Sequence, residues 1–201
     1  MLSSPISVGI QDYTEDYAII EVNDDKIDRC TFKGNTIDFS TQILLWEFTE
    51  KMLSNTNFKY PMDCLLKLQG MITDEMQHLT ILDKNNKPPL VFMKSGRTMG
   101  VTIRCATSIM SFVQEYFDAS EYIISKEWAI LPYDNKSGMF SAPGDLGSVI
   151  VNGCGHVSGL LMGGAGTKDT SDINVSYATP ISFLMESIRV NGYPNAHLDL
   201  D

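Results

Sequence analysis

The last third of the chain constrains the fold most, because its turn and strand signals follow one another without a gap. Residues 143–148 read Pro-Gly-Asp-Leu-Gly-Ser, and glycines on both sides of an aspartate are typical of a sharp turn. The apolar residues after it predict a strand over 148–151, a tight Asn-Gly turn at 152–153 and a returning strand over 157–161. This order predicts a β-hairpin directly after the turn.

The elements that follow the hairpin are also legible. Residues 162–166 read Met-Gly-Gly-Ala-Gly, an open glycine-rich segment, and residues 176–181 read Ser-Tyr-Ala-Thr-Pro-Ile, a strand. Thr179 is expected to cap an amphipathic C-terminal helix with Pro180 in its first turn. The Asn-Gly pair at 191–192 is expected to end that helix.

Taken alone, the Gly-Asp motif is more typical of a plain turn before a strand. The full succession of turn, hairpin, glycine segment, Tyr-x-Thr strand and helix resembles the second barrel of chymotrypsin-like (trypsin-like) serine proteases. Residues 16–22 resemble the segment that carries the triad aspartate, and residues 94–102 resemble the opening of the second barrel in a group of fungal trypsin-like proteins. The Glu-Trp-Ala-Ile stretch at 127–130 and the Ala-Pro pair at 142–143 are similar to the same group.

The resemblance runs from about residue 16 to the end and implies a mainly β, chymotrypsin-like barrel fold. The N-terminal barrel is expected to be truncated, with an inserted α-helix near 41–53 and an α-helix at the C-terminus. A Pro-Pro linker signal at 83–89 divides the chain. We therefore expect a partial N-terminal barrel region with a helical insertion over 1–88, and a trypsin-like barrel with its terminal helix over 89–201.

The inserted helix is predicted from its own periodicity. Its apolar residues fall on one stripe: Leu44, Leu45, Phe48 and Met52. Trp46 lies off this stripe and is expected to pack on a second face, with exposure to solvent as the alternative. A strand is expected over 64–70.

The resemblance also locates a site and shows that it is defective. It places the triad aspartate at Asp16 and the nucleophile at Leu146, whose side chain has neither an acidic proton nor a lone pair. The backbone N–H groups of Gly144 and Leu146 are expected to form an oxyanion hole, which a side-chain change does not delete. Alternatively, Leu146 fills the cleft as part of the core. No metal and no cofactor is expected.

The general base is missing as well. In this fold the triad histidine precedes the aspartate, and none of the fifteen residues before Asp16 is a histidine. The three histidines, His78, His156 and His197, all follow Asp16, and none is expected to act as the base. Ser148 does not replace the nucleophile, because two residues along a strand displace a side chain by roughly 6–7 Å.

The substrate cleft is implied by two further segments. Phe140 is expected at the base of the specificity pocket, which it either leaves open for an apolar group or fills. Met162, Gly163 and Gly164 are expected to form a wall that admits an extended peptide by strand addition, with a flexible surface loop as the alternative.

Asp145 requires a partner of its own. The resemblance implies that the aspartate beside the nucleophile is buried and paired with a cation, often a freed amino terminus. An unpaired buried carboxylate is costly or becomes protonated. Arg104 and Lys126 are the candidate partners, and the sequence does not choose between them.

Composition limits the function classes. A net charge of −10 and a pI near 4.6 oppose binding to nucleic acid or to anionic membranes. No apolar run approaches the about 18 residues of a membrane-spanning helix. The chain start lacks signal-peptide features and the four cysteines form no metal motif, so a cytoplasmic location with reduced thiols is expected, while secretion by another route stays open.

These observations predict a pseudoprotease, a trypsin-like scaffold that binds a peptide or protein without cleaving it. A missing N-terminal segment or a second copy of the chain are candidate partners. The alternative is a serine endopeptidase that is inactive only in this chain, through truncation and a Ser-to-Leu change. A third interpretation is a structural β-domain without a cleft function.

Overall fold

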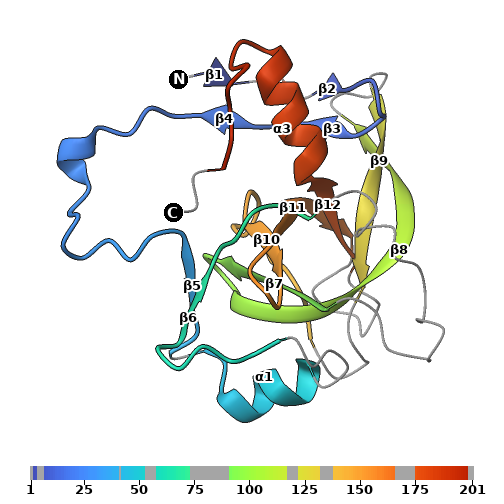
Figure 1. Cartoon of the computed structure of the whole chain (residues 1–201). Coiled ribbons are helices and arrows are strands. Elements are labelled where there is room, and N and C mark those ends of the chain that lie inside the picture. Colours follow the sequence, from blue (N-terminus) through green and yellow to red (C-terminus); the bar gives the residue numbers. More distant parts are fainter. Residues whose placement is uncertain are drawn as a thin grey trace.

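The core of the molecule is a closed barrel of six antiparallel strands (Figure 1). The computed structural model describes residues 2–3, 7–40, 42–52, 58–72, 91–116, 122–131, 138–165 and 175–198. The barrel strands are β7 (Val91–Gly96), β8 (Gly100–Tyr116), β9 (Tyr122–Leu131), β10 (Val149–Asn152), β11 (Val157–Ala165) and β12 (Val175–Pro180). The mainly β class predicted from the sequence is confirmed.

The strands follow a Greek-key path. β7, β8 and β9 are neighbours in chain order, and β10 then returns to pair with β7. β11 pairs with β10, and β12 closes the barrel between β11 and β9. Closure gives each of the six strands a paired neighbour on both sides over part of its length. The hairpin predicted over 148–161 is β10–β11, and β11 continues into the predicted glycine segment as far as Ala165.

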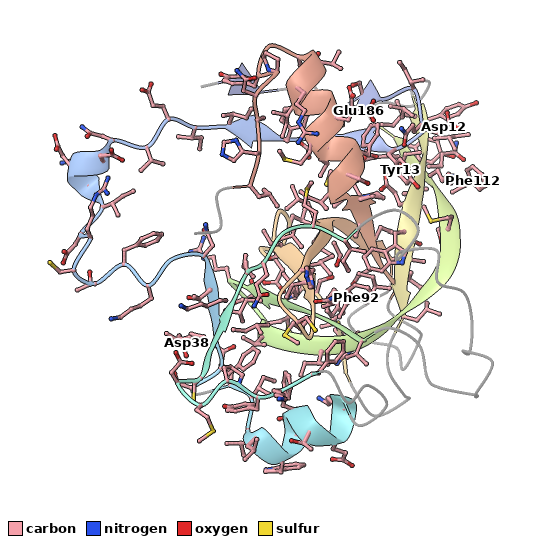
Figure 2. All side chains as sticks on the ribbon, in the orientation of Figure 1. Asp12, Tyr13, Asp38, Phe92, Phe112 and Glu186 are labelled. Carbon is pink, nitrogen blue, oxygen red and sulfur yellow. The ribbon has the colours of Figure 1, made fainter. Side chains whose placement is uncertain are left out.

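The barrel interior is filled by one face of each strand, as the alternation of side chains requires. Phe92 and Trp128 meet edge to face, with ring centroids 4.7 Å apart. Figure 2 shows Phe92 inside the barrel and Phe112 outside it, on the part of β8 that extends beyond the barrel with β9. The inner cluster is completed by Ile72, Ile130, Phe140, Ile150, Leu161 and Ala178.

The C-terminal helix α3 (Ile181–Val190) follows β12 directly and confirms the predicted terminal helix. Pro180, not Thr179, is the N-cap residue, because the Thr179 hydroxyl is already used by a buried carboxylate of β9. The helix ends at Asn191, and Gly192 has a φ of +112°, which favours glycine.

The N-terminal segment lies beside α3 at one end of the barrel (Figure 1). Its short strands are β1 (Leu2–Ser3), which pairs with β4 (Ala18–Ile19), and β2 (Ser7–Val8), which pairs with β3 (Thr14–Glu15). Tyr13 and Tyr17 pack against Phe183 and Leu184 of the helix. This segment is therefore fixed to α3 by apolar contacts.

A buried carboxylate joins the same segment to the barrel. Glu127 of β9 accepts hydrogen bonds from the Thr14 backbone N–H (3.0 Å) and from the Thr179 hydroxyl (2.9 Å). Burial raises the pKa of Glu127, and these hydrogen bonds counteract that rise. The segment that contains Asp16 is thus held on two sides.

A second subregion covers the opposite end of the barrel. It contains β5 (Thr36–Asp38), the helix α1 (Leu45–Met52) and β6 (Leu65–Lys67), with β5 and β6 paired. The 3₁₀ turn η1 (Asp24–Lys26) lies in the largely exposed connection between β4 and β5 and buries no residue. Phe39, Phe48 and Tyr60 pack together with ring centroids 5.5–5.7 Å apart. This aromatic group belongs to one core cluster with Met93 and Ile103 of the barrel. The predicted division at residue 88 lies outside the described residues and stays a prediction.

The predicted helix near 41–53 is confirmed, but its buried face is narrower than expected. Phe48 is buried, whereas Leu44, Leu45 and Trp46 are all more than half exposed. The expected apolar stripe is therefore wrong at Leu44 and Leu45, and Trp46 does not pack on a second face. The reason is geometric, because α1 packs against the rest of the fold along the side that carries Phe48.

Two general properties follow from the described residues. Neither helix described is long and apolar enough to cross a membrane. The cysteines at 30, 64 and 154 are free thiols.

The shared core predicts a sharp difference between two phenylalanines. Phe39 is fully buried, whereas Phe32 is 56% exposed. We expect Phe39→Ala to lower the free energy of unfolding by about 3–5 kcal/mol, because it removes a core side chain and leaves a cavity. Phe32→Ala is the matched control and should change it by less than about 0.5 kcal/mol. Urea denaturation measures both, and equal losses would contradict a common core.

Candidate functional site

The turn over 143–148 is held in place by one fully buried carboxylate. Asp145 accepts a hydrogen bond from the ammonium of Lys94 on β7, at 3.0 Å, and both side chains are completely inaccessible to solvent. The backbone N–H groups of Thr98, Ala142 and Met99 also donate to Asp145, at 2.6, 3.1 and 3.3 Å. The turn is therefore tied to β7 and to the β7–β8 connection.

Lys94 is the cation that sequence reasoning missed. Of the two candidates, Arg104 donates to the Met139 carbonyl at 2.9 Å, and Lys126 places its ammonium 5.4 Å from the centre of the Tyr13 ring. The signal for Lys94 lies in its surroundings, because it ends the buried run Val-Phe-Met-Lys of β7. A lysine in such a run requires a buried partner.

The environment of Asp145 also sets its protonation. Burial by itself raises the pKa of this carboxyl group. The bond from Lys94 and the N–H donors of Thr98, Ala142 and Met99 outweigh that effect, so the pKa of Asp145 lies below its ordinary value of 3.8. Asp145 is therefore ionised at neutral pH.

The backbone of the turn leaves two amides available. Gly144 has a φ of +99°, and a Cβ at this position would lie 2.6 Å from the Thr98 hydroxyl oxygen. The N–H groups of Asp145 and Gly147 donate to the carbonyls of Ala142 and Leu161. Within the described residues, the N–H groups of Gly144 and Leu146 have no acceptor. These are the two donors that the sequence assigned to an oxyanion hole, and that role stays a prediction.

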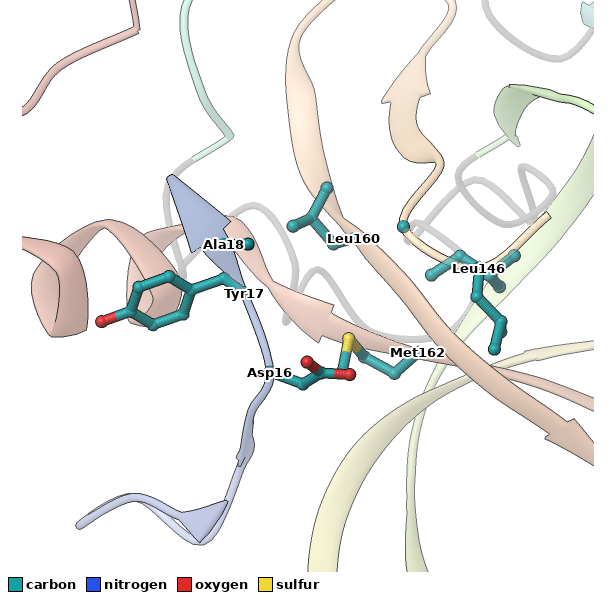
Figure 3. Close-up of a pocket in the computed structure, with 8 residues that line it drawn as sticks. Asp16, Tyr17, Ala18, Leu146, Leu160 and Met162 are labelled. Carbon is teal, nitrogen blue, oxygen red and sulfur yellow. The ribbon is translucent and has the colours of Figure 1, made fainter. Parts of the chain in front are cut away.

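A pocket of about 350 Å³ lies next to this turn (Figure 3). Three separate segments form it: the connection between β3 and β4, the turn itself and β11. The described residues that line it are Asp16, Tyr17, Ala18, Leu146, Gly147, Leu160, Leu161 and Met162. The fold thus brings Asp16 and Leu146, the predicted aspartate and nucleophile positions, to the same cavity.

Leu146 stands at this pocket as an accessible side chain. It is 62% exposed, so the alternative in which it fills the cleft as core is wrong. Met162, predicted as part of the cleft wall, lines the pocket from β11.

The other predicted cleft residues lie elsewhere. Phe140 is 1% exposed and belongs to the inner barrel cluster, with the Lys94 ammonium 5.6 Å from its ring centre. Gly163 and Gly164 extend β11 past the pocket and pair with β12, after a register shift that follows Leu161. Their assignment to a substrate cleft stays a prediction.

Among the described residues, the other candidate reactive side chains do not line this pocket. His156 lies in the β10–β11 connection, and His197 is near the C-terminus, where its ring contacts the Asn195 carbonyl. His78 lies outside the described residues. The Ser148 hydroxyl donates to the Asp145 carbonyl. In the described ranges, no three His, Cys, Asp or Glu side chains form a group able to hold a metal ion.

The chain is similar to solved structures of serine proteases. A chymotrypsin from Cellulomonas bogoriensis is 14% identical with a TM-score of 0.40, and the match covers 65% of this chain and 57% of that chain. A Nocardiopsis protease is 16% identical with a TM-score of 0.41, covering 65% and 55%. A serine protease specific for glutamic acid is 15% identical with a TM-score of 0.40, covering 65% and 56%. The match thus spans little more than half of each of these proteins.

No family model matches this chain, and no curated protein sequence matches it.

The buried ion pair predicts a large effect of removing one charge. Lys94→Met leaves the Asp145 carboxylate buried without a cation and should lower the free energy of unfolding by about 3–5 kcal/mol. The matched control is Arg29→Met, because Arg29 pairs with Asp24 at 3.4 Å with both side chains more than three-quarters exposed. Urea denaturation should show little change for the control. A similarly small loss for Lys94→Met would contradict the pairing.

The lowered pKa of Asp145 predicts acid sensitivity of definite sign. Below the ordinary value of 3.8 the unfolded chain takes up the proton first, so the stabilisation is present above that pH. It is lost as pH falls through the folded pKa. Comparing urea midpoints at about pH 5 and about pH 2.5 should show a smaller loss for Asp145→Asn than for the unsubstituted protein. Equal losses would assign the acid sensitivity to other carboxylates.

Proposed function

We propose that this chain is a catalytically silent homologue of trypsin-like serine proteases, of the fungal type that residues 94–102 resemble, and that it binds a peptide or protein. The observation that carries the proposal is the pocket that joins Asp16 to Leu146. Two segments far apart in the sequence, each matched to a triad position by its own motif, line one cavity.

The absence of hydrolysis follows from the chemistry of the site. Acyl transfer requires a nucleophile and a base that approach within about 3 Å. The Leu146 side chain offers no nucleophilic atom, and the Ser148 hydroxyl is bonded to the Asp145 carbonyl. Neither His156 nor His197 lines the pocket. The described residues therefore supply no pair able to run the reaction.

The features that remain support binding. The turn is rigidly positioned by Asp145, and the N–H groups of Gly144 and Leu146 are available to a carbonyl or carboxylate oxygen. Past the pocket, Gly163 and Gly164 pair with β12 on one side of β11 and carry no side chains, and such a backbone suits an extended peptide that adds as a strand. Together these groups match the main chain of a polypeptide ligand.

The net charge of the chain and its free thiols bear on the proposed partner and on the compartment in which the two would meet. A net charge of −10 supports a partner other than nucleic acid or an anionic membrane surface. The free thiols at 30, 64 and 154 support a reducing compartment such as the cytoplasm.

A second candidate is a serine endopeptidase that is inactive only in this chain, because leucine stands at position 146 where the resemblance implies a serine. The intact turn and the presence of Asp16 in the pocket favour this candidate over a purely structural β-domain. The two candidates differ in whether a serine at 146 restores reactivity.

Labelling with a fluorophosphonate probe tests the proposal. We expect no labelling of the unsubstituted protein, because Leu146 cannot attack the phosphorus atom. We also expect none for Leu146→Ser, since loss of the histidine alone reduces turnover by about 10⁶ in subtilisin. Intact-protein mass spectrometry measures the adduct, and Ser148→Ala is the control for an unexpected site.

The possible results separate the candidates. Labelling of the unsubstituted protein would contradict the proposal outright. Labelling of Leu146→Ser alone would support the endopeptidase candidate, because a working base would then have to reach position 146.

A further inference from the structure

The pocket beside Leu146 has an unusual balance of groups. Among its described lining residues Asp16 carries the one acidic or basic side chain, and Leu146, Leu160 and Met162 contribute apolar surface. In the described residues, no lysine, arginine or histidine lies within 4.0 Å of the Asp16 carboxylate. The cavity therefore combines one negative charge with apolar walls.

The position of Asp16 is fixed by its neighbours in the chain. Glu15 accepts hydrogen bonds from the hydroxyls of Ser187 (2.8 Å) and Ser7 (3.2 Å), away from the pocket. Tyr17 directs its hydroxyl to Ser187 (3.3 Å) and accepts a bond from the Asn191 amide (3.0 Å). Since both neighbours are anchored to α3, the backbone at Asp16 is held in place.

Figure 3 shows how the side chains of Asp16 and Tyr17 are oriented at the pocket. The ring of Tyr17 points away from Leu146, whereas the carboxylate of Asp16 is directed toward Met162. Asp16 is exposed, so an opposite charge can reach its carboxylate from solvent. A cationic head on an apolar stem satisfies both parts of the cavity, and lysine and arginine side chains have this construction.

We propose that this pocket binds a lysine or arginine side chain of a polypeptide partner. The charged head lies at Asp16, and the methylene stem lies against Leu146, Leu160 and Met162. The inference rests on the proposed function, in that it names the side chain recognised by the proposed peptide-binding site. It concerns a different place from the specificity pocket, whose base the sequence assigns to Phe140, a residue buried in the barrel.

The overall charge of the chain agrees with this ligand class. A net charge of −10 attracts cationic partners over long range and increases their rate of encounter. The competing ligand is a peptide carboxylate at the N–H groups of Gly144 and Leu146, which Asp16 in the same pocket would disfavour by repulsion.

The test compares two peptides that have blocked, uncharged termini and differ by one side-chain charge. The probes are acetyl-Ala-Ala-Lys-Ala-amide and the same peptide with norleucine, which has a similar unbranched stem without the ammonium group. Binding is measured by chemical-shift titration of the ¹⁵N-labelled protein, which also reports whether the amides of Leu146 and Met162 respond. Mass spectrometry of the peptide at the end of each titration detects cleavage separately.

Asp16→Asn removes the charge with little change of shape. Asp12→Asn is the matched control, because Asp12 is an exposed aspartate near the same segment but does not line the pocket. Its φ of +65° is tolerated by asparagine, so the control should fold normally.

We expect the lysine peptide to bind about fivefold more tightly than the norleucine peptide at low salt. Asp16→Asn should abolish this preference, Asp12→Asn should keep it, and added salt should reduce it. Equal binding of the two peptides, or an unchanged preference in Asp16→Asn, would overturn this inference and leave the proposed peptide binding standing. Binding of neither peptide would overturn both this inference and the proposed peptide binding. Cleavage of either peptide would contradict the proposed loss of catalysis, and the titration would still report the preference for lysine.

Discussion

The ion pair between Lys94 and Asp145 is the constraint on which the site depends. It connects the first barrel strand to the turn before the fourth, and both charges are fully removed from water. Gly96 belongs to the same arrangement, because a Cβ there would lie 2.5 Å from an Asp145 oxygen and 2.6 Å from the Lys94 ammonium. A buried pair of this kind contributes little net stability compared with an apolar packing, but it specifies a single geometry by the number of donors it satisfies.

In the same turn, the groups that fix the backbone are different from the side chain at the predicted nucleophile position. The carboxylate of Asp145 accepts from the amides of Ala142, Thr98 and Met99, and the amides of Gly144 and Leu146 take no part in these bonds. The side chain at 146 takes no part in them either. The identity of that residue can therefore change the chemistry of the site while the backbone around it keeps its shape.

The fold was predictable from the sequence where local patterns coincide with tertiary structure. The hairpin over 148–161 carries its turn residues, and the terminal helix its Asn-Gly stop, at the positions that the structure uses, whereas the N-cap is Pro180 and not the predicted Thr179. α1 was predictable as a helix, but its exposed Leu44 and Leu45 were not, because the side it buries is decided by distant aromatic residues such as Phe39. The meeting of Asp16 with Leu146 was anticipated by family resemblance alone. The buried run Val-Phe-Met-Lys indicates that Lys94 needs a partner, but the partner lies 51 positions away in the sequence, and no local pattern identifies it.

The internal origin of the cation at Asp145 has a consequence for when the site takes shape. Here the ammonium belongs to a strand of the barrel itself, so the turn reaches its final form when β7 and β10 pair. The ion pair is thus completed by strand pairing, and the shape of the turn is a property of folding.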